Sequence, residues 1–264
     1  MEPGTPDPAP TAPDPPPPPV NVDWSVPPGP QAGHPLDRDV FEASRLRGGP
    51  LRPLMVVDAL LKEPGAVYRR IWNGEDAGLF AGSIFVMSLA FAAIYGALMG
   101  SFGGATQSLY AAIKFPLVLI GSMAICLPSF YVFSSILGSK LSIRQTTLLV
   151  LCITGPTATL LMGFAPIAWF FTISTESGPF MAGLHIVMVG IATTFGIGSL
   201  QRARDYLLHL SGNRAEAGLG LLAVWVVVYL AVLCQMSTYL RPLLAPGPFF
   251  TGEKQLFLSV LFGG

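Results

Sequence analysis

The chain has 264 residues, of which 52% are hydrophobic and only 11% are charged, whereas a typical soluble domain has about 25% charged residues. Fifteen basic and fifteen acidic residues give a net charge of zero, so the composition indicates neither a basic surface for nucleic acid nor a strongly acidic chain. All but four of the acidic residues precede residue 77, which divides the chain into a polar first part and an apolar remainder.

The polar part opens with a proline-rich segment. Residues 1–35 contain fourteen of the 25 prolines, including the run Pro15–Pro19. This composition cannot form an apolar core, so we predict a disordered or polyproline II tail over residues 1–50. The stretch DPPPPPV is a candidate binding site for a cytoplasmic partner with an SH3- or WW-like groove; a solvated spacer is the alternative. We expect no secretory signal, because no basic region followed by an apolar one opens the chain.

Residues 51–76 mix apolar and charged residues at helical spacing. A helix here can gather four apolar residues on one face: Leu54, Val57, Leu60 and Leu61. Three charged residues lie mostly off that face: Asp58, Lys62 and Glu63. Pro64 and Gly65 end this helix and a short second one begins. We predict an amphipathic segment that lies along a membrane interface, with Tyr68 and Trp72 near the lipid headgroups.

Five apolar segments without Asp, Glu, Lys or Arg follow, at about residues 78–101, 115–138, 146–171, 180–200 and 219–240. Each has the roughly 20 residues that a helix needs to cross a hydrocarbon core of about 30 Å. Backbone groups find no hydrogen-bonding partner in lipid, so spanning segments of this kind must be helical. The predicted fold is all-α: a five-helix transmembrane domain over residues 77–264, in a lipid bilayer.

The distribution of Lys and Arg predicts the orientation. A cytoplasmic N-terminus places all but three of the basic residues inside, and leaves Lys114, Arg241 and Lys254 outside. The positive-inside rule therefore favours a multi-pass protein of the cell membrane with its N-terminus in the cytoplasm and its C-terminus outside. In the last stretch, QLFLSVLF is too short to span, and we predict a small outer-face segment there.

A stripe of small residues runs along the first span at intervals of four: Ser88, Ala92, Gly96, Gly100 and Gly104. Small residues let two helices approach closely in lipid. We interpret the stripe as a helix-packing surface within one chain. A contact in a homo-oligomer is the alternative.

Three prolines lie within predicted spans: Pro128, Pro156 and Pro166. Each removes a backbone donor, so we expect kinks whose freed carbonyls are bonded by nearby hydroxyls. The stretch around Pro156 is also typical of a broken helix, which in some transporters builds a substrate site near the bilayer midplane. No charge accompanies it, and we favour a structural kink.

His185 is an ionisable residue within a predicted span, of the kind that proton relays use. Because it has no acidic or second histidine partner, we interpret it as an interhelical hydrogen-bonding residue, and we interpret Gln235 in the same way.

The cysteines have no metal-ligand spacing and are expected to be apolar packing residues: Cys126, Cys152 and Cys234. No catalytic, cofactor-binding or metal motif is present, so we predict a protein that is not an enzyme. Glu176 is assigned to an outer helix–loop–helix turn.

The sequence resembles Yip1-type membrane proteins and a family of uncharacterised bacterial multispanning proteins of this type. The stretches that carry the resemblance are ALLKEPGAVYRRIW, AAIKFPLVLIGSMAICLPSFYVFSSILG, GFAPIAWFFTISTESGPFM and QMSTYLRPLL. The resemblance implies a cytosolic N-terminal region before five closely spaced helices. We therefore expect a non-enzymatic membrane scaffold or accessory subunit that presents its tail to the cytoplasm. A permease or translocator of a small molecule or lipid, using the proline-kinked helices, is the alternative.

Overall fold

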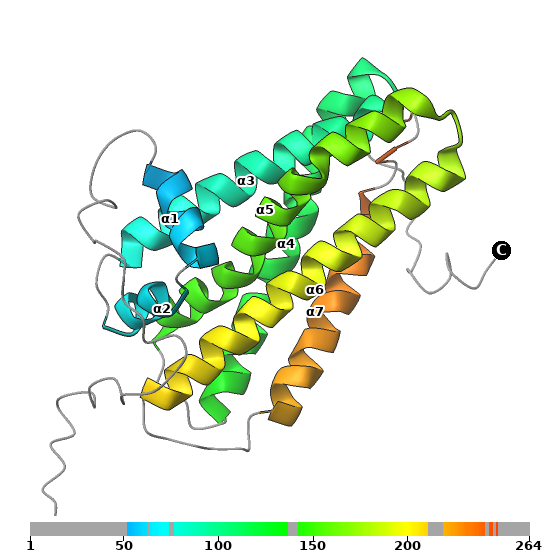
Figure 1. Cartoon of the computed structure of the whole chain (residues 1–264). Helices are drawn as coiled ribbons and strands as arrows, with labels where there is room; N and C mark the ends of the chain where they lie inside the picture. The colour runs from blue at the N-terminus through cyan, green and yellow to red at the C-terminus, as the bar shows by residue number, and fades with distance from the viewer. Residues whose placement is uncertain are drawn as a thin grey trace, which may run out of the picture.

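The computed structural model describes residues 52–62, 64–73, 77–136, 142–210, 219–240, 243–244 and 247. Their regular structure is entirely helical, as predicted. Seven α-helices follow one another (Figure 1): α1 (Arg52–Lys62), α2 (Pro64–Asn73), α3 (Ala77–Ser101), α4 (Ala105–Ile136), α5 (Ile143–Ser174), α6 (Gly178–Leu210) and α7 (Leu219–Tyr239). The predictions for the tail over residues 1–50 and for QLFLSVLF lie outside the described residues.

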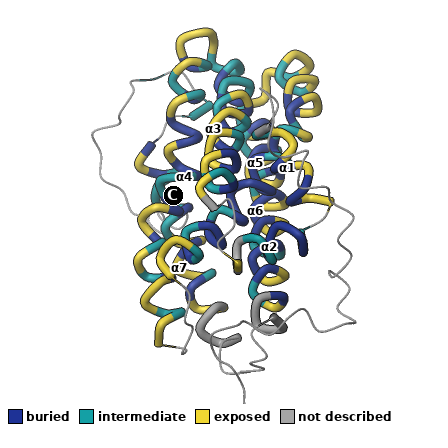
Figure 2. The backbone as a smooth tube through the Cα atoms, turned by 90° about the vertical axis from the view of Figure 1, so that its left-hand side faces the viewer, coloured by how far each residue is buried: buried dark blue, intermediate teal, exposed yellow. Residues whose placement is uncertain are grey.

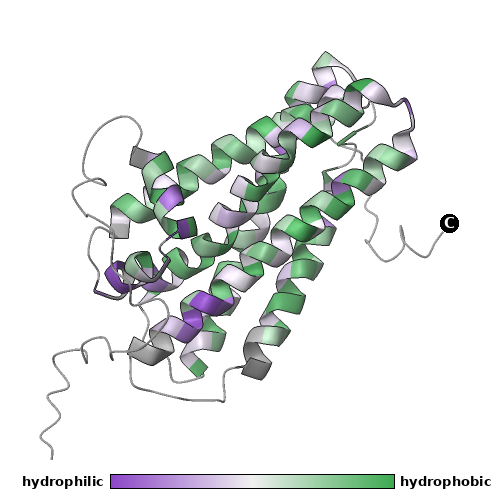
Figure 3. Ribbon diagram, viewed as in Figure 1, coloured by the Kyte–Doolittle hydropathy of each residue, from purple (hydrophilic) through white to green (hydrophobic). Residues whose placement is uncertain are grey.

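Four of these helices, α3 to α6, are long and apolar enough to cross a membrane, and Figure 3 shows hydrophobic residues along most of their length. The expectation of a helical membrane protein is therefore confirmed. The count of five spans is not confirmed, because the apolar stretch assigned in α7, Ala223–Tyr239, belongs to the shorter apolar helices of 10–17 residues.

The second span begins ten residues earlier than its sequence prediction. Helix α4 starts at Ala105 and continues through Pro116, which was expected to open the span. A fully buried lysine, Lys114, therefore lies within the helix instead of in an outer loop. The predicted span began at Phe115, one residue after Lys114. The prediction that this span carries no charge is therefore wrong.

Helix α5 lies at the centre of the bundle. It packs most extensively against α3 and α6, whereas α4 packs mainly against α3, and α7 packs against α4. Successive long helices run in opposite directions (Figure 1). In α5, 72% of the spanning window is buried, against 33–39% in the other three, and Figure 2 shows many exposed positions along α7. Helix α5 is thus enclosed by protein from Thr146 to Leu161, whereas large residues toward its end are exposed: Ile167, Trp169, Phe170 and Ile173.

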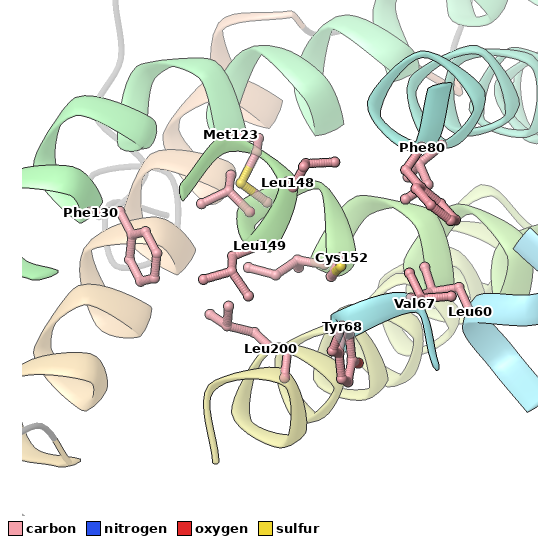
Figure 4. Packing of buried hydrophobic residues seen from close by; sticks show 14 of the residues in the cluster. Leu60, Val67, Tyr68, Phe80, Met123, Phe130, Leu148, Leu149, Cys152 and Leu200 are labelled. Carbon is pink, nitrogen blue, oxygen red and sulfur yellow. The ribbon is translucent and has the colours of Figure 1, made fainter. Parts of the chain in front are cut away.

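At one end of the bundle, α1 and α2 pack onto the spanning helices and form what we call the hairpin cluster. Figure 4 shows its side chains converging from α1 to α6. The buried members of α1 and α2 include Val56, Leu60, Val67 and Tyr68. This differs from the predicted face of α1, because Leu54 and Leu61 are 45% and 41% exposed. Helix α1 has more apolar residues than the four of the predicted face. The contacts of α1 with α3 and α5 determine which of them are buried.

The opposite end holds the turns between α3 and α4 and between α5 and α6. Its buried residues form a second group, which we call the turn cluster: Ala92, Tyr95, Met99, Phe115, Leu119, Ala158, Leu161, Ala165, Ala168, Met188 and Ala192. Five of these eleven residues are alanines. In the α3–α4 turn, Gly104 has a φ of 101°, a conformation that glycine adopts without steric cost.

Candidate functional site

A buried hydrogen bond between α3 and α6 lies at the turn-cluster end of the bundle. The Tyr95 hydroxyl lies 2.9 Å from Nδ1 of His185, and the two rings meet edge to face at 5.6 Å between centroids. The hydroxyl also lies 3.5 Å from Sδ of Met188. Tyr95 is 0% and His185 3% exposed. The interhelical hydrogen bonding that the sequence suggests for His185 thus has a specific partner.

The other ring nitrogen of His185 has no hydrogen-bonding partner within the described part of the chain. The same holds for the hydroxyls of Ser88 on α3 and Thr193 on α6, and all three side chains are almost fully buried. A buried polar atom without a partner costs about 1–3 kcal/mol. Of these three atoms, only the ring nitrogen of His185 belongs to a side chain that bonds across to the other helix, through Nδ1 and Tyr95.

Helices α5 and α6 approach each other closely at Gly196. A Cβ atom there would clash with Oγ1 of Thr157 and lie 2.6 Å from the carbonyl oxygen of Ile153. The Thr157 hydroxyl donates to the Ile153 carbonyl within α5, at 2.7 Å. The Thr157 hydroxyl and the Ile153 carbonyl of α5 therefore pack directly on the backbone of α6, so there is no room for a side chain at Gly196.

Two members of the predicted small-residue stripe, Gly96 and Gly100, lie against α4. A Cβ at Gly96 would lie 2.8 Å from Cβ of Phe115, and one at Gly100 would lie 2.6 Å from Cβ of Ala111. The Ser108 hydroxyl of α4 donates to the Ala97 carbonyl of α3 at 2.8 Å. The other members lie elsewhere: Ser88 and Ala92 are buried on α3, and Gly104 is in the turn.

The three prolines lie within continuous helices, Pro128 in α4 and Pro156 and Pro166 in α5. The broken helix that was the alternative to a kink around Pro156 is not present, because α5 is one helix from Ile143 to Ser174. Hydroxyls bond to carbonyls near each of the first two prolines: Ser129 to Cys126 at 2.8 Å and Thr159 to Gly155 at 2.8 Å. Helix α5 thus has no interruption at Pro156 that could form a ligand site.

Tyr68 anchors α2 to α6 at the hairpin-cluster end. Its hydroxyl donates to the carbonyl of Ser199 at 3.2 Å and lies 3.3 Å from the Ser199 hydroxyl. Arg69 donates to the Tyr206 hydroxyl from Nη2 at 3.1 Å. Burial raises the pKa of the Tyr68 phenol above its ordinary value, so the phenol stays protonated and remains a donor. Tyr68 thus faces the bundle and not the headgroups, where it was expected; the Trp72 side chain is outside the described residues.

Helix α7 is attached to α4 by an aromatic contact. The Trp225 indole donates to the Cys126 carbonyl at 3.2 Å, lies 4.6 Å from Phe130 and stacks on Tyr229 with an interplanar angle of 8°. Gln235 lies further along α7 and is partly buried. This contact is one attachment of α7 to α4, and a small apolar cluster of Val118 with Leu233 and Leu240 is another.

Lys114 is the residue whose position the sequence prediction missed. It is 0% exposed, and its Nζ lies 6.0 Å from the centroid of the Tyr110 ring. Ionisable residues within membrane spans often mark functional sites. The signal that could have located it is the apolar stretch that precedes it, SLYAAI, which continues the helix pattern toward Ala105.

Glu176 is exposed in the turn between α5 and α6, where the sequence places it. Cys126 and Cys152 are buried free thiols, and Cys234 is partly buried. Among the described residues, no group of three or more His, Cys, Asp or Glu side chains could hold a metal ion.

A comparison of the chain with known protein families, curated proteins and solved structures finds no match.

Proposed function

We propose that this protein is a non-enzymatic membrane scaffold or accessory subunit that presents the N-terminal segment, residues 1–50, to a partner in the cytoplasm. The role is that expected from the resemblance to Yip1-type proteins. A scaffold of this kind needs a firm connection between its presented segment and its membrane domain, and the α1–α2 hairpin supplies one.

The docking of α2 on α6 is the observation that carries this proposal. Residues 1–50 precede α1 directly, and α1 and α2 are packed against α3, α5 and α6. The Tyr68–Ser199 and Arg69–Tyr206 bonds link positions more than 130 residues apart in the chain. A partner bound to the tail would therefore be held at a fixed end of the bundle.

The competing proposal is a permease that moves a small molecule or lipid past the prolines of α5. Its support is the set of buried hydroxyls on α3, α5 and α6. Against it, α5 is the most enclosed of the spanning helices, and its seven consecutive residues Cys152–Ala158 are all buried. A carrier that used this helix would have to separate it from α3 and α6 in every transport cycle.

Affinity purification of the full chain from its own membrane, beside a variant lacking residues 1–35, tests the proposal. We expect a specific co-purifying protein with the full chain, its loss with the deletion, and unchanged extraction and elution of the bundle. Identical co-purifying proteins from both forms would contradict a presented tail. Reconstitution of both forms in liposomes provides the second arm, because solute flux that persists without the tail would support the permease instead.

We also propose that the N-terminus is cytoplasmic and that α7 is a fifth span. Reporters inserted after residues 104, 142, 175 and 210 should read outside, inside, outside and inside. The first reporter is placed after residue 104 because this residue lies in the turn before α4. A reporter at the C-terminus should read outside; a cytoplasmic signal there would mean that α7 does not cross and that the protein has four spans.

A further inference from the structure

The hairpin-cluster end of the bundle carries most of the positive charge in the described part of the chain (Figure 3). The basic residues there are Lys62, Arg69, Arg70, Arg144, Arg202 and Arg204. The carboxylates described at this end are each paired on their own helix: Asp58 Oδ1 lies 2.8 Å from Lys62 Nζ, and Asp205 Oδ1 lies 3.7 Å from Arg204 Nη2. Among the described residues, Arg202 is therefore left without a carboxylate partner.

Arg202 lies on the outer face of α6, one turn before the end of its membrane-spanning stretch at Tyr206. Arg202 is exposed, and so is Phe195 on the same face, at 42%. Ser199 and Ala203, on the opposite side of these turns, are buried against the bundle. In a bilayer, the face that carries Arg202 therefore meets lipid.

The side chain of Arg202 runs back along α6 instead of extending past the end of the span. Its Cζ lies 5.6 Å from the centroid of the Phe195 ring, and its Nη1 lies 3.7 Å from the place that a Cβ would take at Gly198. Side chains on a helix lean toward its N-terminus, and a cation over an aromatic face is attracted to it. The guanidinium is thus held beside residue 198, four residues deeper in the span than Arg202 itself.

Arg69 brings a second guanidinium to the line where α2 meets α6, which we call the α2–α6 seam: Tyr68, Arg69, Ser199, Arg202 and Tyr206. Arg69 donates to the Tyr206 hydroxyl from Nε at 3.3 Å and from Nη2 at 3.1 Å, and Tyr206 is one turn from Arg202 on α6. Burial raises the pKa of the Tyr68 phenol, and the nearby charge of Arg202 is among the smaller effects that lower it. Guanidinium groups from two helices therefore lie along one seam.

We propose that the α2–α6 seam binds the phosphate of an anionic phospholipid and that Arg202 contacts this phosphate. A guanidinium presents its N–H groups in a planar fork that matches phosphate oxygens. A cation on the lipid-facing side of a span is costly unless an anion accompanies it, and anionic lipid headgroups supply such an anion at the membrane surface. The exposed Phe195 ring beside the guanidinium offers an apolar contact to the lipid chain.

The depth of the guanidinium favours a lipid over an acidic peptide as the occupant. The spanning stretch of α6 has 29 residues, more than the roughly 20 that a hydrocarbon core requires, so its last turns extend into the headgroup region. The Arg202 guanidinium lies toward the inner edge of that region. A lipid phosphate reaches this edge from within the bilayer, whereas a peptide would have to bring unpaired backbone groups to the hydrocarbon.

The test is lipid binding to the full chain in an uncharged detergent, with bound lipids counted by native mass spectrometry. Phosphatidylglycerol is the anionic probe and phosphatidylcholine the zwitterionic comparison. We expect the first phosphatidylglycerol to bind more tightly than phosphatidylcholine. Arg202→Gln should weaken its binding about ten-fold, because a charge-assisted hydrogen bond is lost. Arg202→Lys keeps the charge without the planar fork and should weaken it less than Arg202→Gln does.

Arg144→Gln is the matched control. Arg144 is exposed at the start of α5 and has no carboxylate partner among the described residues. Its Nη2 lies 3.7 Å from the place of a Cβ at Gly78 of α3, so this variant removes the same charge from the same end but away from the seam. It should change the affinity for phosphatidylglycerol by less than about two-fold, as expected for an exposed charge.

Three results would overturn the proposal. Equal losses of affinity in Arg202→Gln and Arg144→Gln would show that the lipid responds only to the overall charge of this end. Equal affinity of the wild-type chain for the two lipids would exclude an anionic site, and displacement of the lipid by an equal concentration of inorganic phosphate would exclude a lipid as the occupant. Binding that is unchanged by Arg202→Gln would contradict it as well, and would favour the acidic residues of segment 1–50 as partners of the seam. These readouts are independent of partner recruitment, which tests the scaffold role.

Discussion

Helices α5 and α7 are both apolar, but they differ in how much of each helix is buried in the bundle. The stretch of α5 from Thr146 to Leu161 is enclosed by α3, α4 and α6, whereas α7 packs against α4 and exposes large residues such as Val224 and Val227, at 54% and 65%. The buried stretch of α5 contains small and hydroxyl residues, Thr154, Gly155 and Thr157. In lipid, apolar surface gains little by being buried, and close contact of small residues decides which helix is central.

The largest effect is expected from disrupting the close contact between α5 and α6 at Gly196. Gly196→Ala places a Cβ where Thr157 Oγ1 and the Ile153 carbonyl lie, and overpacking typically costs about 1–3 kcal/mol or more. Because backbone is one of the clashing groups, we expect a loss of about 3 kcal/mol, seen as a lower midpoint in detergent unfolding.

Gly190→Ala on the same helix is the matched control. No atom lies within 4 Å of a Cβ at that position, and replacing glycine by alanine in a helix gains up to about 1 kcal/mol. The two substitutions should therefore shift the unfolding midpoint in opposite directions. Equal shifts would show that α6 does not approach α5 as described.

The second test concerns the attachment of α7. Trp225→Ala removes the indole bond to Cys126 and the contacts with Phe130 and Tyr229, and deletion of a buried aromatic side chain costs about 3 kcal/mol. We expect α7 to become accessible to protease while α3 to α6 stay protected. Val227→Ala, at a 65% exposed position, should leave the cleavage pattern unchanged, and equal protection of both variants would contradict Trp225 as the main attachment of α7.

A smaller effect is expected at the hairpin. Tyr68→Phe removes the hydroxyl that bonds to Ser199, and a lost hydrogen bond of this type costs about 1 kcal/mol. Hydrogen exchange in α1 and α2 should rise about five-fold, while exchange in α5 stays constant. Tyr131→Phe, at a 38% exposed position on α4, is the control, and unchanged exchange in α2 would remove the main support for a fixed tail.

The smallest effect is expected at the exposed turn between α5 and α6. Glu176→Gln changes a carboxylate on the surface, and surface substitutions stay within about 0.5 kcal/mol. Unfolding in detergent and partner recruitment should both match the wild-type chain. Loss of partner recruitment in this variant would indicate that the partner binds at the α5–α6 turn and not at the tail.

The membrane character could be predicted from the sequence because the absence of charge over about 20 residues depends on composition alone. The start of α4 could not, because Lys114 looked like a boundary and is in fact buried within the helix. The face of α1 was also wrong in part, since Leu54 and Leu61 are exposed and burial there depends on the position of α3 and α5. His185 could be singled out by residue type, but its bond to Tyr95 joins residues 90 positions apart, and no local pattern predicts such a pairing.

The close approach at Gly96 and Gly100 has a consequence for the order of assembly. Helices α3 and α4 are consecutive, and three residues separate their ends, so their contact needs only a short loop and can close as soon as α4 leaves the ribosome. Helix α5 is synthesised next and meets a finished two-helix surface on one side, before α6 exists to cover the other. We therefore expect biogenesis of the protein to proceed from a preassembled α3–α4 pair outward, so a synthesis pause placed after α4 should yield a compact, protease-resistant intermediate.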